Sequence, residues 1–445
     1  MKIGIIGGGF MGLVAAQKLA GEGKQITVFE RAAQLGGLAT YHDFGDFTFD
    51  RFYHVILPGD RYLLEVIDDL GLTAQLRWKK TYTGYYVNQK FYSISNNKEF
   101  LLFPPLGLIS KFRLALTILY ASRIEDWRKM EGMTIEDWLV KVGGRKTFEK
   151  FWKPLLLAKL GENYKRVSAV FIWTYIKRLF EARSDSAAKE EQMGYVSGGY
   201  KTVFDRMAEV LPQRGATIRS STTVERIEPA PGGGLYVTAD GQTEHFDKVI
   251  FTSPTNVLEQ VADPSLMEVK GDSRQVEYLG VLCMVLATTR NLTPFYVCNL
   301  ADERVPFTGV IGMTTLVDPQ EVNGHYLTYL PKYVLSTDPV LKKSDEEIKA
   351  WFLDGIKTLY PDLKDEEISG VYLNRAFKVQ PLQVLNYSQI VPQAKTLHPD
   401  FFVVNTSQFV NDTLNNNSVA RHVSRFVEEY GGEFEVESEK LKVKS

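Results

Sequence analysis

The chain has little cysteine, and this excludes the folds that depend on cross-links. Its 445 residues include two cysteines, Cys283 and Cys298. Two thiols are too few for a disulfide framework or for a zinc site held by cysteines. Free cysteines of this kind behave as small apolar residues. We therefore expect both thiols to be reduced and buried, as is usual in a cytoplasmic protein.

The chain also lacks an excess of either charge. Lys and Arg number 52 against 54 for Asp and Glu, which gives a formal net charge of -2. Proteins that coat nucleic acid usually carry a strong basic excess, so nucleic acid is not an expected partner. The six histidines are spread along the chain, and no metal site is predicted.

No stretch reaches the roughly 18 to 20 apolar residues of a membrane span. The longest candidate, 103–120, is interrupted by Lys111 and Arg113. Glycines break the apolar run at the start of the chain, which is not the pattern of a signal peptide. We expect a soluble, cytoplasmic protein. The segment 103–123 suits either packing as an ordinary helix, which is the preferred interpretation, or peripheral contact with a membrane.

The first thirty residues follow the order strand, glycine-rich turn, helix, strand, acid. An apolar strand at 2–6 leads into Gly7-Gly-Gly-Phe-Met-Gly12, which fits the pattern G-x-G-x-x-G. A helical pattern follows to residue 20, and a second strand at 25–29 ends at Glu30. This order is typical of a site for the ADP half of a dinucleotide.

Each glycine of that pattern, and the acid, has a physical role in binding. Gly7 permits the tight turn, Gly9 lets the backbone approach a pyrophosphate, and Gly12 lets the helix pack closely on the strand. The helix N-terminus offers unpaired N–H groups to the phosphates. Glu30 can accept hydrogen bonds from the ribose hydroxyls, and its charge would repel a 2′-phosphate. NADP is therefore disfavoured at this site.

A second glycine pair, Gly36-Gly37, follows Glu30 by six residues. With this pair, the run from Ile3 to Thr40 resembles the extended dinucleotide motif of the flavin-containing amine oxidase superfamily. That superfamily includes protoporphyrinogen oxidases, phytoene-type desaturases and monoamine oxidases. The resemblance implies FAD as the cofactor, because NAD dehydrogenases have no comparable pair. The cofactor contacts that it implies are Gly7, Gly9, Phe10, Met11, Gly12, Glu30, Arg31, Gly36, Gly37, Leu38, Val224, Asn417, Ser418 and Val419.

The resemblance also implies an α/β fold with a discontinuous Rossmann-like FAD-binding domain and an inserted α+β substrate domain. The FAD-binding domain is expected at 1–75, 190–262 and 395–435, and the substrate domain at 76–189 and 263–394. Through its backbone, Val224 would contact the adenine. A helix starting near Asn417 would point its N-terminus at the flavin, with Asn417 or Ser418 as its N-cap.

One position departs from the pattern of the superfamily. Most relatives carry Gly-Glu or Gly-Asp after the last strand of the FAD-binding domain, whereas this chain has Asn405-Thr406. The group that would hold the ribityl hydroxyls is therefore left open.

The segment 49–56, Phe-Asp-Arg-Phe-Tyr-His-Val-Ile, contains the candidate catalytic residue. UDP-galactopyranose mutases carry a related histidine-bearing segment there, and some protoporphyrinogen-oxidase-like proteins have a similar run. His54 is hence a candidate for contact with the flavin or for proton donation. The alternative is a buried histidine that is hydrogen-bonded to backbone.

No second nucleotide-binding motif follows an apolar strand, which argues against a pyridine-nucleotide reductase. The predicted function is an FAD-dependent oxidoreductase, protoporphyrinogen oxidase-like, that transfers hydride from a small-molecule or lipid-like substrate to flavin N5. The alternative is a redox-neutral mutase resembling UDP-galactopyranose mutase. A flavin-binding protein without turnover is a third hypothesis.

Overall fold

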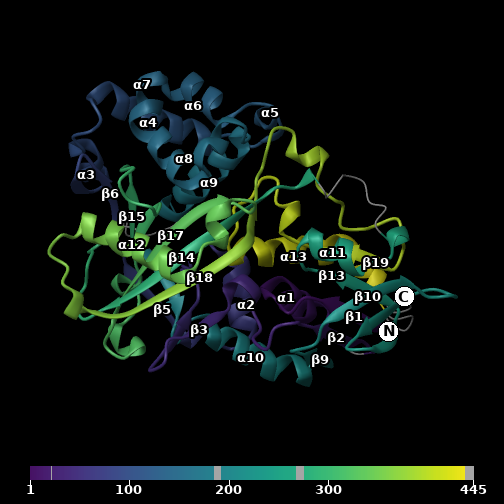
Figure 1. Ribbon diagram of the computed structural model, residues 1–445. Helices are drawn as coiled ribbons and strands as arrows, with labels where there is room; N and C mark the ends of the chain where they lie inside the picture. The colour runs from purple at the N-terminus through teal and green to yellow at the C-terminus, as the bar shows by residue number, and fades with distance from the viewer. Residues whose placement is uncertain (22, 185–191, 267–274, 436–445) are drawn as a thin grey trace.

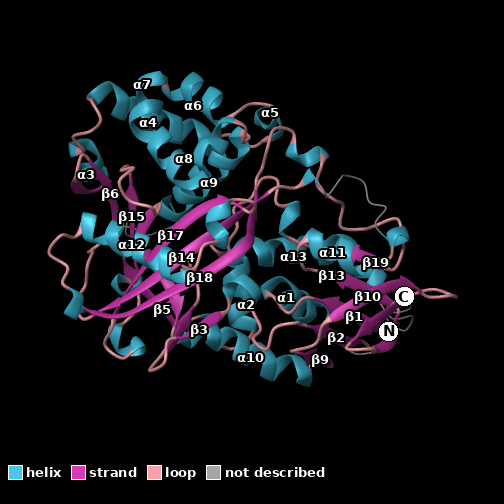
Figure 2. Ribbon diagram, in the orientation of Figure 1, coloured by secondary structure: helices cyan, strands magenta, loops and turns pink. Residues whose placement is uncertain are grey.

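The computed structural model describes residues 1–21, 23–184, 192–266 and 275–435. Two lobes lie side by side (Figure 1). One is built on a five-stranded sheet and contains the first strand of the chain. The other is built on a seven-stranded sheet and carries a group of helices at its outer end, as the colouring by secondary structure shows (Figure 2).

The five-stranded sheet is parallel throughout and has the order β19-β13-β1-β2-β9. Its strands come from segments that are far apart in the sequence. Their bounds are β1 (Lys2–Ile6), β2 (Gln25–Phe29), β9 (Ala216–Arg219), β13 (Lys248–Phe251) and β19 (Phe401–Val403). In β1 every residue from Ile3 to Ile6 is buried, as expected for the centre of a parallel sheet covered on both faces.

Helices cover one face of this sheet, and a small antiparallel sheet covers the other. The apolar cluster on the first face includes residues of α1 (Phe10–Leu19), α2 (Arg61–Asp69), α10 (Tyr200–Gln213) and α13 (Asn416–Tyr430). The second face packs against β10 (Val224–Pro229), β11 (Leu235–Ala239), β12 (Gln242–Phe246) and α11 (Thr255–Val261). The predicted Rossmann-like α/β arrangement is confirmed.

The seven-stranded sheet forms the centre of the second lobe. Its order is β18-β14-β17-β16-β15-β6-β7. The strands are β6 (Thr83–Val87), β7 (Lys90–Ser93), β14 (Tyr278–Thr288), β15 (Val297–Leu300), β16 (Gly309–Gly312), β17 (Tyr326–Leu335) and β18 (Ile368–Pro381). α12 (Asp345–Leu359), which starts at a capping box formed by Ser344 and Glu347, packs on one face.

The helical part of this lobe is drawn at the top of Figure 1. It comprises α3 (Asn97–Leu102), α4 (Leu108–Ser122), α5 (Arg128–Glu131), α6 (Ile135–Gly143), α7 (Arg145–Thr147), α8 (Lys153–Leu160) and α9 (Ala169–Ser184). Buried aromatic side chains, among them Trp138, Trp152 and Trp173, form its core. No helix within the described ranges has the length and apolar composition needed to cross a bilayer.

Short antiparallel pairs complete the fold. β3 (Tyr41–Asp43) pairs with β4 (Thr48–Asp50), and β5 (Leu76–Lys80) pairs with β8 (Gln192–Val196). The two cysteines lie in β14 and β15 and are buried without forming a disulfide, which confirms the expectation for both. Burial raises the pKa of the Cys298 thiol to about 12, so this thiol stays protonated at neutral pH.

Gly12 provides a direct test of the packing between β1 and α1. A Cβ atom at this position would lie 1.9 Å from the backbone oxygen of Gly7, so even alanine has to displace the main chain. We expect Gly12→Ala to lower the free energy of unfolding by about 3 kcal/mol or more. A Cβ at Gly21, which follows the C-cap of the same helix, would meet no atom within 4 Å, so Gly21→Ala serves as the control. Urea unfolding of both variants measures the difference, and equal stabilities would contradict the packing role.

Candidate dinucleotide site and adjoining cavity

The turn between β1 and α1 requires glycine for two reasons. Gly7 has a φ of 115°, a conformation that other residues rarely adopt. A Cβ there would also lie 2.7 Å from the Thr252 hydroxyl, which donates to the carbonyls of Ile6 and Gly7. The Gly7 N–H in turn donates to the Phe29 carbonyl at 2.8 Å. The turn is therefore held at the carboxyl ends of β1 and β2.

The N-terminus of α1 keeps hydrogen-bond donors for a ligand. Its N-cap, Gly9, has no side chain to accept them. Within the described chain, no hydrogen bond reaches the N–H groups of Met11 and Gly12. Unpaired N–H groups and the helix dipole attract phosphate. A diphosphate therefore suits this end of the helix.

Glu30 and the second glycine pair close around the same turn. The Glu30 carboxylate accepts the N–H of Gly8 at 2.8 Å and that of Ala32 at 2.7 Å. The Gly36 N–H donates to the Gly8 carbonyl at 2.9 Å, and Gly36 and Gly37 both have positive φ. A Cβ on Gly37 would lie 3.2 Å from the Gly9 Cα. The two glycine-rich loops are thus in direct contact, as the sequence pattern requires for one cofactor site.

The remaining predicted contacts lie in two groups. Arg31 lies in the loop after β2 and is exposed, and Leu38 lies in the short 3-10 helix Gly37–Ala39. Val224 begins β10, and the nearby Thr222 N–H donates to the Glu30 carbonyl at 2.9 Å. The structure therefore brings the start of β10 next to Glu30. Asn417, Ser418 and Val419 lie in the first turn of α13, which packs on α1 and α2.

The predicted N-cap of α13 is wrong. The capping side chain is Asn415, which accepts the Ser418 N–H at 2.9 Å, rather than Asn417 or Ser418. The Asn417 side chain instead faces α2, where its oxygen accepts the N–H groups of Tyr62 and Leu63 at 3.0 and 3.2 Å. The sequence offers three consecutive asparagines, and the neighbouring helix decides which of them caps α13.

Asn405 is the first residue of the Asn405-Thr406 pair, where the chain departs from the pattern of the superfamily. Its side chain is buried, accepts the N–H and the hydroxyl of Ser407, and donates to the Ser253 carbonyl at 3.0 Å. This amide therefore ties β19 to the loop after β13.

His54 lies in the loop after β4 and lines a small cavity with Asp50 and Tyr200. Its Nδ1 is 3.5 Å from an Asp50 carboxylate oxygen and forms no hydrogen bond with the described residues. Its ring centroid lies 5.1 Å from that of Tyr200. The backbone carbonyl of His54, rather than its ring, accepts a hydrogen bond from the Tyr296 hydroxyl at 3.2 Å. The ring is therefore not held by backbone in the way that the alternative interpretation expected.

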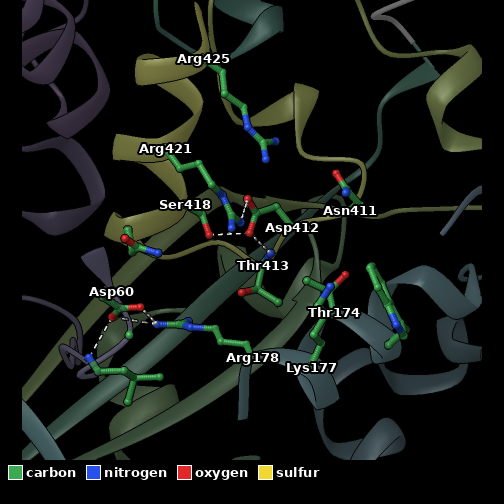
Figure 3. Close-up of a pocket in the computed structure, with 14 residues that line it drawn as sticks. Asp60, Thr174, Lys177, Arg178, Asn411, Asp412, Thr413, Ser418, Arg421 and Arg425 are labelled. Carbon is green, nitrogen blue, oxygen red and sulfur yellow. Dashed lines mark hydrogen bonds and ion pairs between the residues drawn. The ribbon is translucent and has the colours of Figure 1, made fainter. Parts of the chain in front are cut away.

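A larger cavity of about 230 Å³ opens where the two lobes meet (Figure 3). It is lined by the loop that leads into α2, by α9, by the loop 411–413 and by the first three turns of α13. Its charged lining residues are Asp60, Lys177, Arg178, Asp412, Arg421 and Arg425. None of them was predicted from the sequence. The spacing of Asn417, Arg421 and Arg425 by four residues was a usable signal, since it places them on one face of α13.

Two ion pairs are formed by residues that line this cavity. A guanidinium nitrogen of Arg178 lies 3.3 Å from the Asp60 carboxylate, which also accepts the Leu57 N–H at 2.8 Å. Burial raises the pKa of Asp60, and Arg178 opposes that shift. Arg421 forms the second pair with Asp412. Burial, with help from Arg425 and Arg421, lowers the pKa of the adjacent His422 to about 4.

Comparison with known proteins agrees with this geometry. The sequence profile described as "Flavin containing amine oxidoreductase" matches residues 11–401. The chain is 22% identical to the carotenoid phi-ring synthase of Streptomyces griseus, over 70% of this chain and 62% of that protein. It is also 22% identical to the zeta-carotene desaturase of Synechocystis sp., over 51% of this chain and 50% of that protein. The chain thus spans less than two thirds of either relative.

Solved structures share the fold across nearly the whole chain. An oxidoreductase from Methanosarcina mazei has a TM-score of 0.75 at 19% identity, covering 96% of this chain and 100% of the other. Putrescine oxidase bound to putrescine scores 0.70 at 16% identity, covering 97% and 99%. Reduced UDP-galactopyranose mutase scores 0.69 at 16% identity, covering 97% and 95%. The profile match over most of the chain shows that this protein belongs to the flavin-containing amine oxidoreductase family, whose cofactor is FAD.

Proposed function

We propose that the protein is an FAD-dependent oxidoreductase that takes hydride from a small organic substrate. The observation that carries the proposal is the family match over residues 11–401, together with a glycine turn that leaves donors free at the N-terminus of α1. When bound, the flavin supplies the hydride acceptor, and the protein supplies position and electrostatics. The mutase alternative has less support, because neither curated relative described above is named as a mutase.

The ADP half is assigned to the two glycine loops and Glu30. Gly7, Gly9 and Gly12 shape the turn, the N–H groups around Phe10 and Met11 face the diphosphate, and the second glycine pair borders it with Arg31 and Leu38. Glu30 binds the ribose, and the backbone at Val224 borders the adenine. The contact of Gly36 with Gly8 and of Thr222 with Glu30 supports this assignment, because it gathers these segments around one turn.

The flavin end is assigned to the space between α13 and the His54 loop. The first turn of α13, with Asn417, Ser418 and Val419, directs its positive end there. His54 holds or moves a proton at its Nδ1. An Asp50 carboxylate oxygen 3.5 Å from this atom supports the role, because its charge can orient the ring.

Flavin reduction tests the activity. The purified protein should be yellow, and a substrate added without air should bleach the flavin absorption. His54→Gln should slow that bleaching by about a hundredfold or more, the lower end of the range of general acid–base effects. Tyr53→Phe is the matched control. It changes the residue next to His54 in the same loop and removes a hydroxyl that is hydrogen-bonded to the hydroxyl of Tyr333. A colourless protein would contradict the proposal, and an unchanged rate in His54→Gln would contradict the histidine's role.

Removal of the Glu30 carboxylate tests the cofactor site. Glu30→Ala should weaken FAD binding at least about tenfold, because it removes an ionised acceptor of hydrogen bonds from the turn and the ribose. Titration of the apoprotein with FAD, followed by flavin fluorescence, measures the change. Glu225→Ala removes an exposed carboxylate from β10 and should bind FAD as the unaltered protein does. Equal affinities of the two variants would contradict the ribose role.

The outer surface of α3 and α4 favours the hypothesis of a lipid-like substrate and a peripheral membrane contact. The most exposed apolar side chains there are Leu102 at 68%, Leu108 at 79%, Ile109 at 75% and Phe112 at 65%. The opposite face of α4, with Leu114, Thr117 and Ala121, packs in the core as the preferred sequence interpretation expected. A helix that is apolar on both faces suits an interface with lipid.

The charges on this surface favour anionic lipid. Three exposed residues carry charge here, and all are basic. They are Lys98 in α3, Arg113 in α4 and Arg123, which follows α4. The one carboxylate of the two helices, Glu99, accepts hydrogen bonds from Ser93 and from the Ser95 N–H. Basic side chains around an apolar face strengthen attraction to anionic headgroups.

Vesicle binding tests the membrane contact. The triple variant Leu108→Ser, Ile109→Ser, Phe112→Ser should bind vesicles of phosphatidylcholine and phosphatidylglycerol at least about tenfold more weakly, because three large apolar side chains are lost from the contact. Leu397→Ser, which alters a side chain that is 66% exposed on another surface, should bind as before. Co-sedimentation measures both. Failure of the unaltered protein to bind these vesicles would contradict the contact.

A further inference from the structure

We infer that the cavity between α2, α9 and α13 binds a phosphate or carboxylate group of the substrate. The inference rests on the proposed function in one respect, since it takes the ligand of this cavity to be the molecule that is oxidised. The cavity contains room for such a group, with a volume of about 230 Å³. A single ordered water needs roughly 10 to 15 Å³ on the same measure.

The lining of the cavity has more positive than negative charge. Lys177, Arg178, Arg421 and Arg425 face Asp60 and Asp412, so four cations stand against two carboxylates. Figure 3 shows the two arginines of α13 and the two basic residues of α9 on different sides of the space. Because they come from both lobes, a ligand between them would be held from two directions.

The two carboxylates are already committed to hydrogen bonds within the protein. Asp60 accepts from Arg178 and from the Leu57 N–H. Asp412 accepts from Arg421, from the Ser418 hydroxyl and from the Thr413 N–H. These bonds position the two arginines without saturating them. The Nε atoms of Arg178 and Arg421 are both buried and have no acceptor among the described residues.

The other two cations have no carboxylate partner in the described part of the chain. No ion pair of Lys177 or Arg425 is found there. The Lys177 ammonium lies 5.2 Å from the centroid of the Trp173 ring, an interaction that leaves its three donors available. Unsatisfied buried donors and unpaired cations favour an anionic ligand, since a charge-assisted bond is stronger than a neutral one.

Guanidinium groups select the chemistry of that anion. Their fixed fork of N–H donors matches the paired oxygens of phosphate and carboxylate. A halide or a single hydroxyl would engage fewer of the donors. The ligand is therefore an oxyanion carried by the substrate.

The cavity lies beside the residues assigned to the flavin end. Asn417 and Ser418 line it from the first turn of α13. Asp60 and Arg178 both act electrostatically on the Tyr200 phenol, whose ring packs against His54. An oxyanion bound here would anchor the substrate at one end, next to the place assigned to the reaction.

Binding of simple anions tests the inference. Inorganic phosphate and succinate are titrated into the purified protein by calorimetry, with uncharged succinamide as the neutral comparison. We expect one or both anions to bind and succinamide not to bind. The double variant Lys177→Gln, Arg425→Gln should raise the dissociation constant of the anion at least about tenfold, because two charge-assisted contacts are lost. Neither residue belongs to the two ion pairs above, so the variant should fold, and its Tm verifies this.

Arg128→Gln is the matched control. Its guanidinium also lies 5.2 Å from a tryptophan ring, that of Trp127, but it is outside the cavity. This variant should bind the anions within twofold of the unaltered protein. A preference for phosphate or for succinate identifies which oxyanion the site takes. Three outcomes would overturn the inference. The double variant binds the anions as tightly as the unaltered protein, neither anion binds, or succinamide binds as tightly as succinate.

The flavin absorption of the same samples separates this inference from the proposed function. A yellow protein that binds neither anion would overturn the oxyanion site and leave the flavin assignment in place. A colourless protein that binds phosphate through Lys177 and Arg425 would support the site and contradict the proposed function.

Discussion

The parallel pairing of β1 is the constraint on which the rest of the structure depends. β1 pairs with β2 on one side and with β13, more than 240 residues later, on the other. Parallel neighbours cannot be joined by a hairpin, so the chain has to leave the sheet and return. The second lobe is built from the segments that make these excursions, and it is therefore held against the carboxyl ends of the strands, where ligands bind in open α/β sheets.

Two kinds of close contact shape this edge of the sheet, where we propose the binding site. The glycine turns bring backbone against backbone, with Gly36 bonded to Gly8 and no room for a Cβ at Gly12. The second kind of contact is between charged side chains, which line the cavity between α13 and α9. There each of the two carboxylates fixes one arginine, and the excess positive charge has no partner among the described residues. The first contact suits a diphosphate, and the second suits an oxyanion of a different molecule.

The local parts of the site could be predicted because they depend on short-range geometry. A tight turn with positive φ at Gly7, and an acid at the end of β2, follow from neighbouring residues in one βαβ unit. The cap of α13 was predicted at the wrong asparagine, since the choice depends on α2, which uses Asn417 for its own N-terminus. The position of the His54 ring near Tyr200 and Asp50 could not be predicted. It depends on how segments that are distant in the sequence pack together.

The sequence by itself determined the glycine turns and Glu30, on which the proposed cofactor site depends, and it indicated the family. These residues act through backbone conformation, which is set within a few residues of each position. Only the tertiary structure decided the cationic cavity and the exposed apolar face of α4. The cavity combines side chains from α9, from α13 and from the loop before α2. Each of them looks like an ordinary surface residue in its own segment. The exposed face emerges because one side of α4 is already occupied by the core, which leaves its other apolar side facing outward.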